Sequence, residues 1–244
     1  MSVNSILNLM RELDLRGALA AFERFVSSPQ ELDAMPAQLL LETLLQNEVN
    51  NRLIRKQQNL LRMSHLPYVI SPSDIAYDSV RGDEFKAKLT SLMTLDFIKL
   101  GQNLTVFGSA GTGKSYIAAM LGRLACMSGY TTLYYSASEL IDNLQLSYGS
   151  PNYQSKLRTL AVKSLLILDD FCLTEYTTAA QNVLFDVLNA RYGKKSTVIV
   201  SQKLPDAWLN ILGGTALSES IVERAGNNNY TLILKGESRR SSLD

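Results

Sequence analysis

The chain has 244 residues and a formal net charge of +1, with 24 Lys and Arg against 23 Asp and Glu. This balance argues against a protein that coats nucleic acid through a strongly basic surface, and 46% apolar residues exclude an acidic disordered chain. The single histidine, His65, argues against a Ser-His-Asp triad or a multi-histidine metal centre, and Cys126 and Cys172 have the spacing of neither a metal site nor a disulfide framework.

The amino-terminal end has no predicted signal peptide, because Arg11, Glu12 and Asp14 precede any long apolar run. No stretch approaches about 18 uncharged apolar residues, so we predict no membrane association. The two cysteines are interpreted as small core side chains in a reducing compartment. Together these features predict a soluble, cytoplasmic protein.

Residues 1–66 are predicted to form a small all-helical domain that binds DNA or a partner. Apolar residues recur there at three- and four-residue spacings, without strand-like alternation. Ser27-Ser28-Pro29 interrupts this pattern, and Pro36 can provide the first turn of a second helix that runs to about Met63.

The last third of this second helix carries a strip of basic residues. Residues 49–66 include no acidic residue, and the basic side chains fall within one arc of a helical wheel. They are Arg52, Arg55, Lys56 and Arg62. Such a strip either meets a phosphate backbone or is the ordinary solvated face of an amphipathic helix; we predict that it contacts double-stranded DNA.

Pro67 and Pro72 mark a predicted linker over residues 67–80. Residues 81–244 then alternate five short β-rich runs with helical stretches, which predicts an α/β fold with a mostly parallel sheet covered on both faces. The predicted strands are Leu104–Phe107, Thr131–Tyr135, Leu165–Leu168, Thr197–Ser201 and Tyr230–Leu234. The predicted helices are residues 113–128, 138–162 with a break near 149–151, 177–192 and 206–225.

A phosphate-binding loop of the pattern G-x-x-x-x-G-K-[ST] follows the first predicted strand. Its residues are Gly108, Ser109, Ala110, Gly111, Thr112, Gly113, Lys114 and Ser115. Successive backbone N–H groups can face one concavity there, and the next helix adds its amino-terminal partial charge. We expect Lys114 to reach the β- and γ-phosphates of ATP and the Ser115 hydroxyl to bind Mg²⁺. The alternative is a glycine-rich surface turn.

Two carboxylates, Asp169 and Asp170, follow the apolar run of the third predicted strand. In a parallel sheet they lie at the same edge as the phosphate loop. Asp169 suits Mg²⁺, usually through a water, and Asp170 is placed to orient or deprotonate an attacking water. A simple turn after a strand is the alternative, but beside a phosphate loop the pair favours an NTP hydrolase over a small-molecule kinase.

Two further polar positions can complete such a site. The fourth strand ends in Ser201-Gln202, where a polar side chain would lie between the carboxylates and the γ-phosphate. Arg224 lies near the end of the last predicted helix. Its guanidinium either stabilises the γ-phosphate at a neighbouring subunit's site, which can raise the hydrolysis rate by about 10³–10⁵-fold, or pairs with Glu223 or the helix dipole.

These motifs resemble the IstB type of AAA+ ATPase, the helper protein of a family of bacterial insertion sequences that is related to the DnaC helicase loaders. Besides the phosphate loop, the matching stretches are Leu165–Phe171, Arg191–Gly193, Ser201-Gln202 with Pro205 and Trp208, and Leu234–Arg239. The resemblance implies that Gln202, or Ser201, is the sensor-1 residue and that Arg224 is the arginine finger. It also implies ATP-dependent homo-oligomers on double-stranded DNA that prepare a target site and recruit a transposase.

Three features depart from the family or from AAA+ proteins at large. Cys172 stands where glycine is usual, and Glu223 stands where aspartate is common, but neither replaces a catalytic atom. The last predicted strand ends near Lys235, which leaves too few residues for the helical lid of many AAA+ proteins. Arg239 and Arg240 either substitute for a lid-borne arginine or form a mobile basic tail.

Three functions are compatible with these motifs to different degrees. The first is an ATP-dependent DNA-remodelling helper for transposition, with DNA along the basic strip and also near Lys194 and Lys195. The second is a DnaC-like loader that grips a helicase and prefers single-stranded DNA; the basic strip and the Leu234–Arg239 stretch weigh against it. The third, a metabolite kinase, leaves the paired carboxylates and Arg224 unexplained.

Overall fold

A computed structural model of the protein describes residues 3–75, 82–226, 229–236 and 238. The chain divides into two compact units, Met1–Asn59 and Leu60–Asp244. Within the described ranges, no helix combines the length and the apolar character that crossing a membrane requires.

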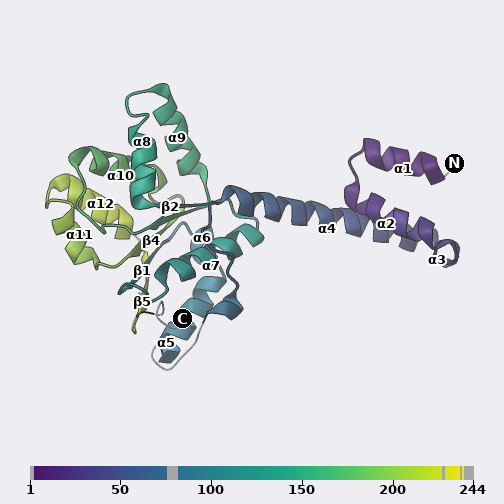
Figure 1. Ribbon diagram of the computed structural model, residues 1–244, viewed down its shortest axis with the longest axis horizontal. Coiled ribbons are helices and arrows are strands. Elements are labelled where there is room, and N and C mark those ends of the chain that lie inside the picture. Colours follow the sequence, from purple (N-terminus) through teal and green to yellow (C-terminus); the bar gives the residue numbers. More distant parts are fainter. Residues whose placement is uncertain (1–2, 76–81, 227–228, 237, 239–244) are drawn as a thin grey trace. The chain divides into compact units, whose positions relative to one another are not determined.

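The first unit is built from helices, as predicted. These are α1 (Val3–Glu12), α2 (Arg16–Ser27), α3 (Pro29–Ala34) and α4 (Ala37–Met63), whose last residues belong to the second unit (Figure 1). The break between α1 and α2 was not predicted; Asp14 has a φ of 50° there, which ends the first helix. Pro36 precedes α4, and its carbonyl accepts the N–H of Leu40, so it begins the helix as expected.

Helices α2 and α4 cross in direct backbone contact at Gly17. A Cβ atom there would lie 2.4 Å from the carbonyl oxygen of Asn47. Next to this crossing, the buried Glu48 of α4 accepts the N–H groups of Gly17 at 2.8 Å and Ala18 at 3.3 Å. Because α2 has no side-chain cap of its own, Glu48 satisfies the free donors of its first turn from another helix.

The second unit has a five-stranded, entirely parallel sheet in the order β2-β3-β4-β1-β5. Its strands are β1 (Asn103–Gly108), β2 (Thr132–Ser136), β3 (Leu165–Asp169), β4 (Ser196–Ser201) and β5 (Asn229–Leu234). The predicted fold class is therefore confirmed, and each strand begins and ends within a residue or so of its predicted position.

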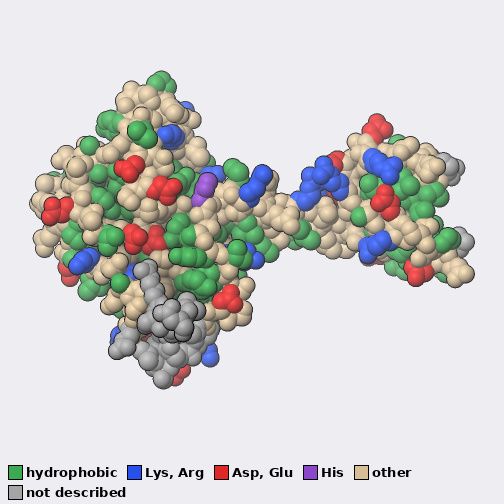
Figure 2. Space-filling view, viewed as in Figure 1, with side chains coloured by type: hydrophobic (Ala, Val, Ile, Leu, Met, Phe, Trp, Pro, Cys, Tyr) green, Lys and Arg blue, Asp and Glu red, His purple; other side chains and the backbone are tan. Residues whose placement is uncertain are grey.

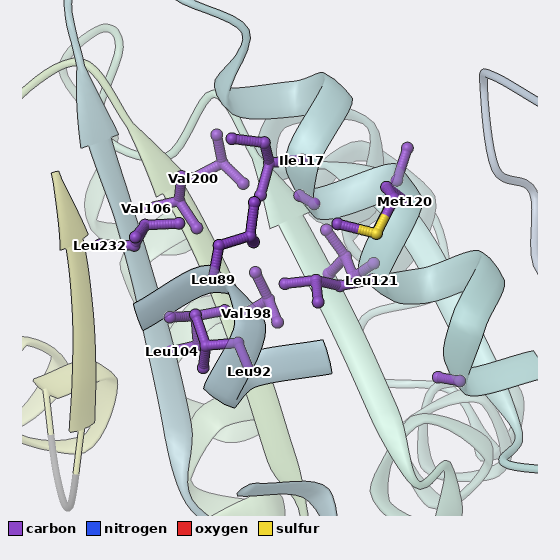
Figure 3. Packing of buried hydrophobic residues seen from close by; sticks show 14 of the residues in the cluster. Leu89, Leu92, Leu104, Val106, Ile117, Met120, Leu121, Val198, Val200 and Leu232 are labelled. Atoms are coloured by element: carbon purple, nitrogen blue, oxygen red, sulfur yellow. The ribbon is translucent and has the colours of Figure 1, made fainter. Parts of the chain in front are cut away.

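Helices cover both faces of this sheet (Figure 1). One face packs against α5 (Gly82–Met93), α6 (Asp96–Lys99) and α7 (Lys114–Met127). Figure 3 shows this layer, in which Leu89 and Ile117 lie beside Val106 and Val200 of the central strands. The other face packs against α8 (Ala137–Gln145), α9 (Pro151–Val162), α10 (Thr178–Arg191), α11 (Pro205–Ile211) and α12 (Ala216–Gly226). Strands covered on both faces explain the uninterrupted apolar runs in the sequence.

Three features of the second unit differ from the predictions. Helices α5 and α6, which precede β1, were not predicted. The helix predicted over residues 206–225 is two helices, because Gly213 and Gly214 both have positive φ angles and end α11. In the predicted linker, residues 67–75 contribute the buried side chains of Ile70 and Ile75 to the core, and residues 76–80 lie outside the described residues. The Ser64 carbonyl also accepts the N–H of Tyr134 in β2, so this segment packs with the second unit from residue 60 onward.

A buried arginine, Arg191, ties α9 and α10 to β4. Its guanidinium donates to the carbonyls of Leu160, Lys163 and Ser196 and to the Thr197 hydroxyl, and burial lowers its pKa to about 9. Two of these carbonyls belong to the carboxyl end of α9, where a positive charge is favoured. Its role within the Arg191–Gly193 stretch is thus structural.

Candidate nucleotide-binding site

The phosphate loop connects β1 to α7, and its backbone depends on glycine. Gly111 and Gly113 have φ angles of 76° and 91°, a region that residues with a side chain rarely adopt. Lys114 is only 7% exposed, and its ammonium group donates to the Ser109 carbonyl at 2.8 Å. The Thr112 hydroxyl donates to the same carbonyl at 2.9 Å. The loop therefore closes around the Ser109 carbonyl, with the Lys114 ammonium group held against it.

The carboxyl-terminal end of the chain also reaches this loop. A Cβ atom on Gly111 would lie 2.1 Å from the hydroxyl oxygen of Ser238, so Ser238 packs directly on the phosphate loop. Ser238 lies in the Leu234–Arg239 stretch, and its contact with the phosphate loop was not predicted. Arg239 and Arg240 lie outside the described residues.

The carboxylate of Asp169 ends β3 and is held at both oxygens. The Tyr134 hydroxyl of β2 donates to Oδ2, and the N–H of Asp170 donates to Oδ1 at 2.8 Å. Burial and the nearby Asp169 charge raise the pKa of Tyr134, so its hydroxyl keeps the proton that it donates. Tyr134 was not predicted as a site residue, because the pairing of β2 with β3 is not visible in the sequence.

Asp170 is exposed and has a φ of 53°, in the left-handed region that costs a residue with a side chain about 1–2 kcal/mol. The next residue, Phe171, is hydrogen-bonded on both sides to β4. Its N–H donates to the Val200 carbonyl at 2.9 Å, and its carbonyl accepts the Ser201 hydroxyl at 2.7 Å. These bonds hold the turn that presents Asp170 to solvent.

The two candidates for the sensor position differ in what their side chains do. Ser201 is buried, and its hydroxyl is also bonded to the Lys203 N–H and the Trp208 indole, each at 3.1 Å. Gln202 is exposed just beyond β4. The geometry favours Gln202, and its sensor role stays a prediction.

Arg224 lies at the other edge of the sheet from the phosphate loop. The main-chain carbonyl of Arg224 accepts a hydrogen bond from the side-chain amide of Asn103, which is the first residue of β1. The phosphate loop begins at the opposite end of β1, at its last residue. The Arg224 side chain is 22% exposed, and its guanidinium donates to the Asn189 side chain at 3.0 Å and lies over the rings of Phe185 and Tyr192. The guanidinium also donates to the Ser220 carbonyl at 3.1 Å, whereas Glu223 is 4.0 Å away, so its closer partners are groups other than Glu223.

A profile of the IstB-like ATP binding proteins matches residues 8–243. The chain belongs to this family. An insertion sequence ATP-binding protein of Sinorhizobium fredii is 34% identical over 240 residues, which are 98% of this chain and 97% of the relative. The IS21 ATP-binding protein of Pseudomonas aeruginosa is 29% identical over 196 residues, 80% of this chain and 74% of the relative.

Solved structures share the fold at low sequence identity. The DnaC helicase loader has a TM-score of 0.55 at 20% identity, covering 73% of this chain and 99% of that one. DnaA from Aquifex aeolicus bound to AMPPCP has a TM-score of 0.56 at 21% identity, covering 72% of this chain and 54% of that one. The second unit is therefore an AAA+ P-loop fold, and the family is one of ATP-binding proteins.

The residues at the loop fit a magnesium ion. Ser115 in the first turn of α7 and Asp169 at the end of β3 offer hydroxyl and carboxylate oxygens, the ligands that Mg²⁺ prefers. In the described part of the chain, no three His, Cys, Asp or Glu side chains cluster as a metal site. Mg²⁺ usually takes one or two protein ligands and completes its shell with phosphate and water.

The basic strip of α4 is more neutral in the fold than in the sequence. All four side chains are exposed, but Arg52 pairs with Glu48 at 2.6 Å and Arg55 pairs with Asp14 at 3.5 Å. Figure 2 shows Lys and Arg side chains interleaved with Asp and Glu over the first unit. DNA contacts of Arg52, Arg55, Lys56 and Arg62 stay a prediction.

Proposed function

We propose that the protein is a Mg²⁺-dependent ATPase that forms ATP-dependent homo-oligomers on double-stranded DNA, prepares a target site and stimulates a partner transposase. The observation that carries this proposal is the common edge of the phosphate loop and the paired carboxylates. In the sheet, Phe107 pairs with Ser201 and Leu168 with Ile199, so the ends of β1 and β3 flank that of β4. Two strand spacings separate them, about 10 Å, which a triphosphate can span.

Each residue has a chemical task in this arrangement. Lys114 would exchange the Ser109 carbonyl for phosphate oxygens, and Asp170 would take the proton of the attacking water. Bound Mg²⁺ would neutralise charge on the β- and γ-phosphate oxygens. Arg224 would serve the site of a neighbouring subunit, which makes hydrolysis depend on assembly.

Assembly also supplies what a single subunit lacks for DNA binding. With Arg52 and Arg55 paired to carboxylates, the basic strip of α4 in one subunit offers phosphates less net positive charge than its sequence suggests. Affinity grows with the number of phosphates neutralised, so several copies aligned by ATP bind where one does not. The insertion sequence relatives support transposition as the setting.

ATP turnover with and without duplex DNA tests this proposal. We expect the wild type to turn over ATP and both Lys114→Ala and Asp170→Asn to show no turnover. The Asp170→Asn variant should still bind ATP. Duplex binding should require ATP and fall steeply with salt. Equal duplex binding without nucleotide, or normal turnover in Asp170→Asn, would show the mechanism to be wrong.

A helicase loader is the second candidate, because the fold of the DnaC helicase loader matches over nearly all of that chain. Such a protein would prefer single-stranded DNA. A competition experiment between duplex and single strands, in the presence of ATP, separates the two functions: preference for duplex supports the transposition helper, and preference for single strands supports the loader.

A further inference from the structure

The chain's one tryptophan, Trp208 of α11, is 0% exposed and belongs to the buried cluster that includes Phe107 and Phe171, which adjoin the candidate nucleotide site in sequence. Its ring centre is 4.8 Å from that of Phe171 and 5.6 Å from that of Phe107. Phe171 directly follows Asp170, and Phe107 directly precedes the phosphate loop. One indole thus contacts the neighbours of both motifs.

The indole also bonds to the strand between them. Its Nε1–H donates to the Ser201 hydroxyl oxygen at 3.1 Å, and the Lys203 N–H donates to the same oxygen. A serine hydroxyl has one proton to donate and two lone pairs that accept. With both lone pairs occupied, the proton is directed to its remaining partner, the Phe171 carbonyl at 2.7 Å.

This chain of bonds ends at the turn that presents Asp170. Asp170 has a left-handed backbone, which persists only where the surrounding structure enforces it. The contacts that hold it include the two bonds of Phe171 to β4, one of which the Ser201 hydroxyl makes, beside the bonds of Asp170's own N–H to the Asp169 carboxylate and of its carbonyl to the Leu173 N–H. Loss of that hydroxyl leaves a buried carbonyl without its partner and frees the turn to relax.

We propose that Ser201 and Trp208 are positioning residues that together hold Asp170 where it can act on the attacking water. This inference rests on the proposed role of Asp170 as the base. It assigns Ser201 a role other than nucleotide sensing and explains why Trp208 occurs in the same stretch as Ser201-Gln202.

The test compares Ser201→Ala and Trp208→Phe with a matched control, Ser196→Ala. Ser196 is a buried serine at the other end of β4, and its hydroxyl also donates to a phenylalanine carbonyl, that of Phe97 at 2.9 Å. We expect kcat to fall about 10- to 100-fold in Ser201→Ala, as for a misplaced catalytic group, while the affinity for ATP is unchanged. Ser196→Ala should keep the wild-type kcat, and Ser201→Thr, which keeps the hydroxyl, should restore turnover.

A second measurement uses Trp208 itself. Because it is the chain's one tryptophan, its emission reports this contact directly. We expect Mg²⁺-ATP to change the emission of the wild type and not that of Ser201→Ala, although both bind ATP. The double variant Ser201→Ala/Trp208→Phe should lose no more kcat than Ser201→Ala alone, since the two act as one unit.

Three outcomes would overturn the inference: wild-type kcat in Ser201→Ala, equal losses in Ser201→Ala and Ser196→Ala, or additive losses in the double variant. Asp170→Asn separates this failure from failure of the proposed function. If Asp170→Asn abolishes turnover while Ser201→Ala does not, the positioning role alone is wrong. If Asp170→Asn turns over normally, the proposed function is wrong.

Discussion

The side-chain amide of Asn103 donates a hydrogen bond to the main-chain carbonyl of Arg224 at 3.0 Å. Asn103 begins β1, and Gly108 ends it, so Arg224 and the phosphate loop are separated by the length of a strand, about 16 Å. Arg224 therefore cannot complete the site of its own subunit without a large rearrangement.

Arg224→Ala should abolish most ATP turnover without weakening ATP binding. Loss of an arginine that acts in trans lowers the rate by about 10³-fold or more. Mixing Arg224→Ala with Lys114→Ala should restore part of the activity, because one interface then has both an intact loop and an intact arginine. Arg24→Ala, an exposed arginine of α2, is the control. Turnover of the mixture no higher than that of either variant would contradict a site shared between subunits.

Tyr134→Phe should raise the Mg²⁺ concentration needed for half-maximal turnover. The variant keeps the ring but removes the hydroxyl that orients the Asp169 carboxylate. Loss of such an outer contact typically costs about 10- to 100-fold in metal affinity. The ratio of ATP affinities with and without Mg²⁺ provides a reading independent of turnover. Tyr135→Phe, the next residue of β2, should behave as wild type.

Cys172→Gly should be more stable than Cys172→Ala by about 1 kcal/mol, although glycine is the smaller residue. Cys172 has a φ of 53°, where a Cβ atom is strained and glycine is not. At an ordinary buried position alanine would be the more stable of the two. Urea unfolding of both variants measures the difference, and greater stability of the alanine variant would show that the strain is absent.

Gly17→Ala should destabilise the first unit by about 1–3 kcal/mol, since the added methyl overlaps the backbone of α4. Gly226→Ala is the matched control, because nothing lies within 4 Å of its position. Amide hydrogen exchange in α2 measures the effect on this unit. Equal exchange in the two variants would contradict the close crossing at Gly17.

Glu48→Gln should speed amide exchange at Gly17 and Ala18 at neutral pH, because their N–H groups lose a charged acceptor. Loss of hydrogen bonds to a charged group lowers the free energy of unfolding by about 1–3 kcal/mol. Burial alone raises the pKa of Glu48, but the hydrogen bonds from Arg52, Ala18 and Gly17 outweigh it and hold the pKa below its ordinary value. The stabilisation is therefore present above the unfolded-state pKa and is lost as pH falls through the folded-state pKa.

The difference between wild type and Glu48→Gln should accordingly vanish in acid. Glu42→Gln, an exposed residue of the same helix, should match the wild type at every pH. A difference that persists unchanged below the folded-state pKa would show that the charge of Glu48 does not act on α2.

Much of the second unit could be predicted because its signals are local. A strand buried on both faces is a continuous apolar run, and the G-x-x-x-x-G-K-S pattern carries its own turn and helix start. The prediction of one helix over residues 206–225 was wrong, because the positive φ angles of Gly213 and Gly214 interrupt the helix although the apolar residues on either side have helical spacing.

The sequence by itself determined the parallel α/β fold, the phosphate loop and the carboxylates that end β3, since each depends on residues that are neighbours in the chain. Only the tertiary structure decided which side chains support them. Tyr134 meets Asp169, Ser201 meets Phe171 and Trp208, and Glu48 meets both α2 and Arg52. The contacts of Tyr134 with Asp169, of Ser201 with Phe171 and of Glu48 with α2 arise from strand order and helix crossing, and they join residues 30 or more positions apart in the chain. Trp208 is only seven residues from Ser201, and Arg52 is four residues from Glu48 on the same helix. The pairing of Arg55 with Asp14 again joins residues that are distant in the sequence.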